Sequence, residues 1–522
     1  HGILDFTRFH PRTREREPIT SDERKVPAIW NMAGDQGRGV AIFGLWATYP
    51  AEPVHGLMVS DRLFSYQRRE APPAGAVSPA SEEAWVRGVL HEVEGGVGEE
   101  ALRAYLPWLS SAEYARLANP PDPFAHPVSA LRRILIETEA YHRLAREWWQ
   151  RGSPQLAIVY HQGTDSIGHV LAPYAEPRQE GISEEDFERY RSVPERYFRE
   201  VDRLLGEYRR LAEASGAVFV IASDHGFLWG EGRPRELSSQ GQATAAKWHR
   251  DEGIYLLWNA GLTAGEGPAG GIRQVCATLL ALLGLPPGRD LAQPPLAGLA
   301  GAGAVHDYAG SLRRIAASGG LPAVAPEELE KLRALGYLGS AERAPAPAGT
   351  ATTRTGGSFN NEGLLLEAEG DSAAAMAAWQ RALATDPGLA SAAWNLSRLL
   401  AAAGQDWDRA DALLLRAFEA GLPEGEQQVA ARARAHQQAG RMPRALRLLD
   451  AALAARPKAG VPRLARGRIR MESQDCAAAA RDFLAATEAR PEDAVAFASL
   501  GLARLCLDDR AGARAALERS LV

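Results

Sequence analysis

The sequence predicts two regions of different fold class. The first is an α/β domain with a mainly parallel sheet sandwiched by helices, and the second is an all-α array of repeated helices. Up to about residue 340, short apolar runs alternate with long amphipathic stretches. A stretch rich in Pro, Ala, Thr and Gly follows, and the rest of the chain repeats with a period of about 34 residues. These observations predict a sheet domain, a linker and a helical solenoid.

Four apolar runs are the predicted strands of the α/β domain. They are VAIFGLWA (40–47), LAIVYH (156–161), AVFVIAS (217–223) and GIYLLWN (253–259). Long amphipathic segments at 130–149 and 196–214 carry apolar residues at helical spacing. Short apolar strands that alternate with long helices favour a mainly parallel sheet, because parallel strands need long crossover connections.

Residues 70–127 contain no strand-like run and are punctuated by prolines, so we predict a helical cap inserted over the sheet. With this insertion, the α/β domain is expected to span residues 1–340. Residues 341–357 have linker composition.

Residues 358–522 carry the repeat. Pro387, Pro423, Pro457 and Pro491 are 36, 34 and 34 residues apart, and Gly370, Gly404 and Gly440 recur in phase with them. A period of 34 with small residues, Ala, an aromatic or Leu, and then Pro resembles the tetratricopeptide repeat. The resemblance implies about five repeats, the fifth starting near Glu492, and a concave surface that binds a protein or peptide partner.

Composition and charge exclude some classes of function. The chain has 522 residues, 59 basic and 65 acidic, with a net charge of −6. The chain therefore has no excess of positive charge that would favour binding to nucleic acid or to an anionic membrane. No stretch approaches 18 uninterrupted apolar residues, so we expect no membrane span within the chain.

The three cysteines, Cys276, Cys476 and Cys506, lie in apolar or Ala-rich segments. We expect them to be buried small residues of packed helices. The absence of any Cys-x-x-Cys pattern makes a thiolate zinc site improbable.

Five candidate ligands follow or precede predicted strands. Asp165 and His169 lie four residues apart in GTDSIGH, Asp224 and His225 follow AVFVIAS, and His249 comes just before GIYLLWN. Four residues apart, two side chains share one face of a helix. In open α/β sheets, ligands bind beyond the carboxyl ends of the strands, so all five side chains are expected at one edge.

Asp oxygen and His nitrogen suit Zn²⁺, and also Mn²⁺ or Fe²⁺. A single catalytic ion has about three protein ligands and keeps one coordination position free for water or substrate, so two Asp and three His are too many for it. They fit two divalent ions, most simply Zn²⁺ with Mn²⁺ as the alternative, that share one substrate. A structural explanation of each Asp/His pair alone, as a helix cap or a plain hydrogen bond, remains open at this point.

The motifs together resemble the type I phosphodiesterase/nucleotide pyrophosphatase family of the alkaline phosphatase superfamily. GTDSIGH resembles its D-x-x-G-H segment, ASDHG its S-D-H-G segment, and WHRDEG the segment of its late ligand histidine. HGILDF at the start, GLWATYPAEP (44–53) and LRALGYL (332–338) also agree with this family. The resemblance covers about residues 1–340.

Carried over by position, the resemblance implies that Asp165, His169 and His249 hold one ion and that Asp224 and His225 hold the other. It also implies a nucleophilic Thr or Ser, and a covalent phosphoryl-enzyme, with the nucleophile expected upstream of residue 1. No motif supports Thr20, Ser21 or Ser60 in that role. The chain as given is therefore expected to be poorly active or inactive.

The leading interpretation is a metal-dependent hydrolase of phosphodiesters or nucleotide-type pyrophosphates, fused to repeats for protein partners. One alternative is a sulfatase- or mutase-like member of the same superfamily. Another is a non-catalytic interaction protein in which the α/β domain is only a scaffold. The resemblance favours an extracytoplasmic location, periplasmic or secreted.

Overall fold

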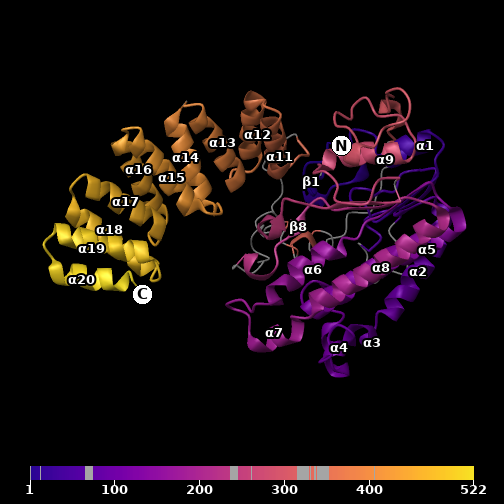
Figure 1. Cartoon of the computed structure of the whole chain (residues 1–522), viewed down its shortest axis with the longest axis horizontal. Coiled ribbons are helices and arrows are strands. Elements are labelled where there is room, and N and C mark those ends of the chain that lie inside the picture. The colour runs from indigo at the N-terminus through magenta and orange to yellow at the C-terminus, as the bar shows by residue number, and fades with distance from the viewer. Residues whose placement is uncertain are drawn as a thin grey trace. The chain divides into compact units, whose positions relative to one another are not determined.

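The computed structural model describes residues 2–11, 13–64, 74–234, 245–259, 261–313, 329, 331–333, 335, 337, 352–404 and 406–521. Its contacts divide the chain into two compact units (Figure 1). The N-terminal unit comprises His1–His10 and Glu15–Pro345, and the C-terminal unit comprises Pro11–Arg14 and Ala346–Val522. The predicted domain boundaries stay a prediction, and most of the predicted linker lies outside the described residues.

A four-stranded sheet forms the centre of the N-terminal unit. Its strand order is β5 (Val77–Ser78), β4 (Gly56–Val59), β3 (Val40–Phe43) and β6 (Leu156–Val159). Strand β3 pairs in parallel with both β4 and β6, whereas β5 is antiparallel to β4. The α/β fold class with parallel pairing at its centre is therefore confirmed.

Both faces of this sheet are covered, which explains why β3 reads as a continuous apolar run. Ala41 and Phe43 of β3 belong to one core cluster, and the alternate residues Val40 and Ile42 belong to another. The first cluster includes residues of α2, α5 and α8, and the second includes residues of α1 and α9 (Figure 1). The helices of this unit are α1 (Ile29–Asp35), α2 (Glu83–Gly96), α3 (Glu99–Arg103), α4 (Ser111–Leu117), α5 (Pro127–Gly152), α6 (Gly163–Leu171), α7 (Glu184–Tyr190), α8 (Val193–Ser215) and α9 (Val275–Leu282).

The remaining strands form antiparallel pairs. They are β1 (Thr7–Phe9) with β2 (Arg16–Pro18), β7 (Phe219–Ala222) with β10 (Tyr255–Trp258), and β8 (Gly226–Phe227) with β9 (His249–Arg250). The runs 217–223 and 253–259 are thus strands as predicted, but they pair with each other in a sheet of their own. The β8–β9 pair matters most for function, because it joins two of the predicted ligand segments.

The predicted helical cap at 70–127 is wrong in one respect. Its described part holds α2, α3 and α4, but also β5, which extends the central sheet. Strand β4 was also missed. Strand β5 has two residues and β4 (GLMV) has three consecutive apolar residues, so neither stands out in the sequence as a strand-like run.

The C-terminal unit consists of helix pairs, so the all-α repeat array is confirmed (Figure 1). The first helices of successive pairs begin at Gly356, Ala390, Gly425, Gly460 and Ala494, 34 or 35 residues apart. The pairs are α11 (Gly356–Ala368) with α12 (Ser372–Thr385), α13 (Ala390–Ala402) with α14 (Trp407–Glu419), α15 (Gly425–Gln438) with α16 (Met442–Ala455), α17 (Gly460–Glu472) with α18 (Cys476–Ala489), and α19 (Ala494–Cys506) with α20 (Arg510–Arg519).

Small residues let the two helices of a pair approach closely. A Cβ added at Gly363 would lie 2.4 Å from Trp379 Nε1, and one at Gly467 would lie 2.5 Å from Phe483 Cε1. Both aromatic rings are buried at 1% exposure or less. Gly363 and Gly467 are therefore packing positions for the aromatic residue of the second helix. The glycines that recur in the sequence, Gly370, Gly404 and Gly440, follow the first helices with positive φ, and an added Cβ there would contact nothing within 4 Å.

The expectation that all three cysteines are simple packed residues is wrong for two of them. Cys476, at the start of α18, and Cys506, at the end of α19, form a disulfide with a Cα–Cα distance of 6.0 Å. The pairing joins consecutive repeats, and sequence spacing gave no signal of it. Cys276 is a free thiol on α9, and burial raises its pKa to about 11.

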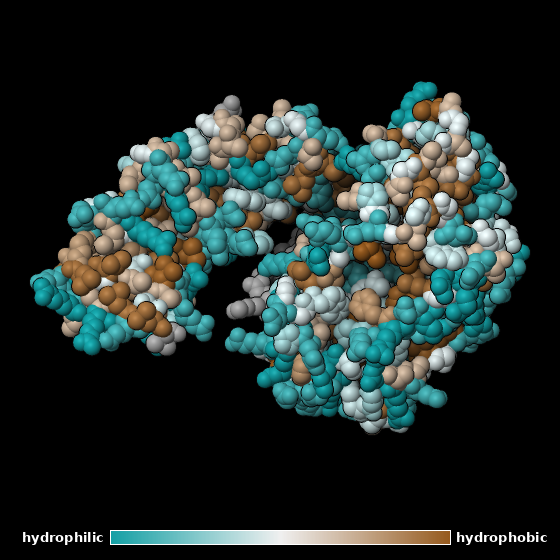
Figure 2. Space-filling view, in the orientation of Figure 1, coloured by the Kyte–Doolittle hydropathy of each residue, from teal (hydrophilic) through white to brown (hydrophobic). Residues whose placement is uncertain are grey.

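No helix among the described residues is long and apolar enough to cross a membrane. On the face shown in Figure 2, hydrophobic residues gather over the last repeats of the C-terminal unit. Exposed apolar side chains there include Leu484, Val495, Leu502, Leu505 and Leu507.

Candidate metal centre

Helix α6 positions the first two predicted ligands. Strand β6 ends at Val159, and α6 begins four residues later at Gly163 and carries Asp165 and His169 one turn apart. Asp165 Oδ1 lies 3.2 Å from His169 Nε2. The His169 side chain is fully buried and that of Asp165 is 13% exposed, so the pair is largely shielded from solvent.

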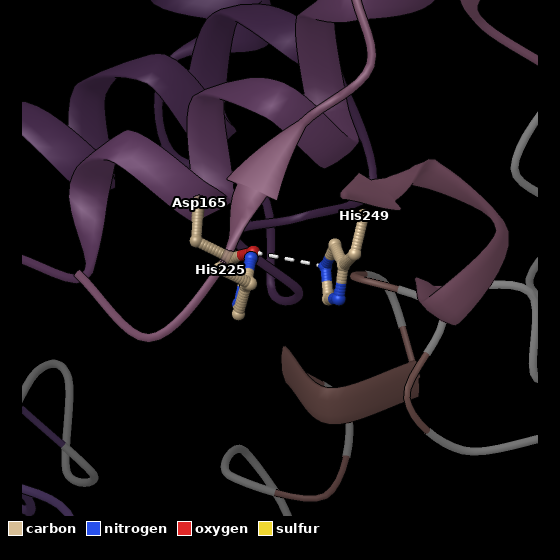
Figure 3. Close-up of side chains that lie close together, drawn as sticks. All are labelled: Asp165, His225 and His249. Atoms are coloured by element: carbon tan, nitrogen blue, oxygen red, sulfur yellow. Dashed lines mark ion pairs between the residues drawn. The ribbon is translucent and has the colours of Figure 1, made fainter. Parts of the chain in front are cut away.

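The β8–β9 pairing brings the third ligand to the same place. In its register, Phe227 lies opposite His249. His249 Nε2 is 3.3 Å from Asp165 Oδ1 and 3.0 Å from His169 Nε2. Figure 3 shows the Asp165 and His249 side chains pointing toward each other from separate elements. Residues 80 positions apart in the sequence thus converge on one point.

Two glycines of the motifs permit this convergence. A Cβ at Gly168 would lie 2.5 Å from Phe227 Cε2, so α6 can approach β8 only without a side chain there. A Cβ at Gly253 would lie 1.9 Å from the carbonyl oxygen of Ser223, so the chain before β10 also needs glycine. Both glycines belong to the motifs quoted from the sequence, and each has a steric reason to be there.

The three donor atoms fit a divalent ion. With zinc bonds of 2.0–2.1 Å, tetrahedral geometry puts neighbouring donor atoms about 3.3 Å apart. The observed separations among Asp165 Oδ1, His169 Nε2 and His249 Nε2 are 3.0, 3.2 and 3.3 Å. Asp165 Oδ1 is buried and receives no well-directed hydrogen bond from any described residue. Three lone-pair donors that face one another in this way suit a shared cation.

His225 lies beside the three donors. Its ring stacks on the His249 ring with centroids 3.9 Å apart and an interplanar angle of 18°. Donor atoms of Asp165, His225 and His249 all lie within 4.8 Å of one another (Figure 3). His225 Nδ1 donates a hydrogen bond to the carbonyl oxygen of Gly226 at 3.0 Å. This bond leaves Nε2 as the nitrogen available to a metal.

Asp224 is the most exposed of the five predicted ligands. Its side chain is 65% exposed, and its Oδ1 atom is 3.9 Å from His225 Nε2. The structure therefore brings Asp165, His169, His225 and His249 together and leaves Asp224 at the edge. The division of these residues between two ions stays a prediction.

The electrostatics of Asp165 favour its anionic form. Burial raises the pKa of its carboxyl group, but the close His169 and His249 side chains outweigh burial and hold the pKa well below its usual range. The carboxylate is therefore ready to bind a cation at neutral pH.

The sequence did not identify Tyr337 as a neighbour of the site. Its hydroxyl group donates a hydrogen bond to Asp165 Oδ2 at 3.0 Å, and its ring centroid is 5.4 Å from that of His169. Burial, together with the nearby Asp165 carboxylate, raises the pKa of Tyr337, so the hydroxyl stays protonated. Tyr337 belongs to the LRALGYL motif, which agrees with the family but did not by itself indicate a role at the metal site.

None of the three hydroxyl residues considered as nucleophiles is free. Thr20 bonds to Asp22 through its hydroxyl group, Ser21 Oγ donates to the carbonyl oxygen of Pro50 at 2.8 Å, and Ser60 is fully buried. His161, next to the motif, is a buried ring whose two nitrogens have no hydrogen-bond partner among the described residues. It contacts Tyr208 rather than the ligand cluster.

Residues 1–255 match the family described as type I phosphodiesterase/nucleotide pyrophosphatase. This region includes all five predicted ligands, so the predicted resemblance to that family is confirmed over residues 1–255. No curated protein matches the chain.

Several solved structures are similar to the C-terminal helices. YrrB, described as a tetratricopeptide-repeat protein with an unusual peptide-binding site, is 20% identical. The match covers 31% of this chain and 84% of that one, with a TM-score of 0.23. A MamA protein is 18% identical over 31% of this chain and 88% of its own, with a TM-score of 0.24. MamA from Desulfovibrio magneticus RS-1 is 15% identical over 31% and 91%, with a TM-score of 0.23.

The fold and the family together define the class. The chain combines an α/β unit that matches the phosphodiesterase/nucleotide pyrophosphatase family over residues 1–255 with an array of tetratricopeptide-like helix pairs. The family match supports a hydrolase of phosphate esters in general.

Proposed function

We propose that the N-terminal unit is a metal-dependent hydrolase of phosphodiesters or nucleotide-type pyrophosphates. Asp165, His169 and His249 would hold one divalent ion, and His225 with Asp224 would contribute to a second. Zn²⁺ suits this donor set best, and Mn²⁺ is the alternative.

One observation carries the proposal. A carboxylate oxygen and two imidazole nitrogens, from α6 and β9, lie 3.0–3.3 Å from one another. A salt bridge or a helix cap needs one pair of groups. It does not need a second imidazole whose nitrogen faces the first at hydrogen-bond distance. Three mutually facing donors are the arrangement expected of a metal site.

The cluster is also accessible from one side. The His169 side chain is fully buried, whereas His249 is 16% and His225 is 28% exposed. His169 thus closes the inner side, and a substrate oxygen can reach the donors from the side of His249 and His225. A bound divalent ion would act there as a Lewis acid on a phosphoryl oxygen.

The proposal assigns no attacking residue, because Thr20, Ser21 and Ser60 are buried or bonded to neighbours. The proposal covers only how this unit would bind the metal ions and the phosphoryl group of the substrate. The Asp165 carboxylate supplies negative charge to the ion, and the imidazoles of His169 and His249 fix its position.

Hydrolysis of three esters by the full-length protein tests the proposal. A chromogenic phosphodiester, a phosphomonoester and a sulfate ester would be compared with added Zn²⁺ or Mn²⁺ and with chelator. We expect chelator-sensitive turnover of the diester above the other two, and its loss by at least about 100-fold in His169→Ala, since a ligand of the reacting ion is removed.

The matched control is His306→Ala, which removes an exposed histidine of the same unit whose ring packs against Tyr308. It should keep full activity. Preferential turnover of the sulfate ester would favour the sulfatase-like alternative. Absence of turnover on every ester, with no metal bound, would leave the non-catalytic scaffold as the better account.

The repeats are proposed to bind a protein or peptide partner on their concave surface. An extracytoplasmic location is proposed as well. The Cys476–Cys506 disulfide supports it, because disulfides persist in oxidising compartments.

A further inference from the structure

We propose that Tyr337 is a positioning residue of the metal centre, which fixes Asp165 so that only Oδ1 faces the ion. The inference rests on the proposed metal-dependent function and deepens it. It assigns a role to a residue 172 positions away in the sequence, from a segment that contributes no ligand.

The two oxygens of the Asp165 carboxylate have different partners. Oδ1 lies 3.2 and 3.3 Å from the Nε2 atoms of His169 and His249. Oδ2 accepts the hydrogen bond from the Tyr337 hydroxyl group at 3.0 Å. A carboxylate held at one oxygen presents the other as a single ligand, which leaves a coordination position open for substrate.

The backbone that carries Tyr337 is anchored by its own turn. Leu335 N donates to the carbonyl oxygen of Lys331 at 3.0 Å, and Tyr337 N donates to that of Leu332 at 2.8 Å. The side chains of Leu332 and Leu335 are fully buried. Burial of Leu332 and Leu335 therefore anchors the backbone that positions Tyr337 beside Asp165.

Lys331 ties the same turn to the start of α6. Its Nζ atom lies 3.0 Å from Glu137 Oε2 and 3.0 Å from Gln162 Oε1. Gln162 is the residue immediately before α6, whose first turn carries Asp165. Lys331 and Glu137 are both largely buried, and Arg133 Nε lies 2.8 Å from Glu137 Oε1, so this carboxylate is held by two cations. The turn thus holds both the beginning of α6 and the side chain of Asp165.

The Tyr337 ring is confined as well. Its centroid is 4.7 Å from that of Phe6, 5.4 Å from that of His169 and 6.0 Å from that of His249. The ring packs against two of the three ligand rings. Its hydroxyl group therefore cannot leave Asp165 by a simple rotation, which is the property required of a positioning residue.

The test uses Co²⁺ as a probe, because its visible absorption reports coordination number as well as binding. The whole chain would be titrated with Co²⁺ after chelator treatment, alongside Tyr337→Phe, Asp165→Ala and Tyr308→Phe. Tyr308 is the matched control, a buried tyrosine whose hydroxyl group donates to the carbonyl oxygen of Pro286 at 2.9 Å. Thermal stability would be measured in chelator for each variant.

For Tyr337→Phe we expect Co²⁺ affinity about 10-fold lower, the lower end of the range for lost outer partners of ligands. We also expect weaker visible absorption, because a released Oδ2 can join Oδ1 on the ion and raise the coordination number. Thermal stability in chelator should stay unchanged, and Tyr308→Phe should match the unaltered chain in affinity and spectrum.

The outcomes separate this inference from the proposed function. If Asp165→Ala loses Co²⁺ while Tyr337→Phe keeps the affinity and spectrum of the unaltered chain, the metal site stands and the role of Tyr337 is overturned. A stability loss in Tyr337→Phe with an unaltered spectrum would also overturn it, since the tyrosine would then support only the fold. No Co²⁺ uptake by the unaltered chain would overturn both.

Discussion

The Nε2 atoms of His169 and His249 lie 3.0 Å apart, and both face the same oxygen of Asp165. His169 comes from α6 and His249 from β9, so the contact depends on how these two elements pack. The Phe227 ring packs against both histidines, with its centroid 5.1 Å from that of His169 and 5.8 Å from that of His249.

The first prediction concerns metal binding itself. The chelator-treated chain should bind Zn²⁺ tightly, and His169→Ala should lower the affinity by at least about 100-fold, since one of three protein ligands is lost. Equilibrium dialysis with metal analysis checks this, with His306→Ala as the control that should behave as the unaltered chain. Equal Zn²⁺ affinity in the two variants would show that the ion binds elsewhere.

The second prediction concerns the close approach of α6 to β8. Gly168→Ala should destabilise the N-terminal unit by about 1–3 kcal/mol, because a Cβ would meet the Phe227 ring at 2.5 Å. That ring is itself packed against His169, Trp248 and His249, so it has little room to move. Metal affinity should fall together with stability. Urea unfolding in chelator and Zn²⁺ titration measure the two effects.

Gly88→Ala is the control for this substitution. Gly88 lies in α2, and an added Cβ there would contact nothing within 4 Å. Alanine should stabilise that helix by roughly 0.5–1 kcal/mol. If Gly168→Ala were equally stabilising, the packing of α6 on β8 described above would be wrong.

The third prediction concerns pH. Burial, together with the neighbouring His142, lowers the pKa of His161 to about 4. Between about pH 6.5 and 4 the unfolded chain binds a proton at His161 that the folded chain does not, so stability falls as pH falls. The full loss is about 3 kcal/mol. His161→Phe should remove this part of the pH dependence, measured by urea unfolding in chelator from pH 7 to 4.

At pH 7 the same variant should be neutral or stabilising. The two ring nitrogens of His161 have no hydrogen-bond partner among the described residues, so an apolar ring removes buried polar atoms without breaking a bond. A large loss of stability at pH 7 would mean that His161 has a polar role in the folded protein.

The fourth prediction concerns the disulfide. The Cys476–Cys506 bond links residues 30 positions apart and should stabilise the C-terminal unit by about 3–4 kcal/mol. Reductant, or Cys476→Ser, should therefore lower the thermal midpoint of that unit. Cys276→Ser, which changes the free thiol, should leave the effect of reductant intact. Identical midpoints with and without reductant would contradict the pairing.

The sequence predicted those parts of the molecule that depend on local pattern. The spacing of Asp165 and His169 fixed their common face on α6, and the prolines and glycines at a period of about 34 marked the helix pairs. The runs around β3, β6, β7 and β10 were visible because buried strands are continuous in apolar residues.

Pairings between distant segments could not be predicted in the same way. The partner of β7 is β10 and that of β8 is β9, and neither choice is encoded in one local pattern. The contact of Tyr337 with Asp165 spans 172 residues, and the disulfide joins cysteines whose surroundings look like ordinary helix. These features depend on tertiary packing, which periodicity does not report.

The role of Asp224 as a ligand stays a prediction. Its Oδ1 atom lies 3.9 Å from His225 Nε2, although its side chain is 65% exposed. His225 faces the cluster, while Asp224 is largely exposed.

The most direct measurement is anomalous X-ray scattering at the zinc absorption edge from crystals of the chain equilibrated with Zn²⁺. The account predicts a peak about 2.0–2.2 Å from Asp165 Oδ1, His169 Nε2 and His249 Nε2 together. Zinc peaks only at other positions, with these three side chains still in direct contact with one another, would contradict it.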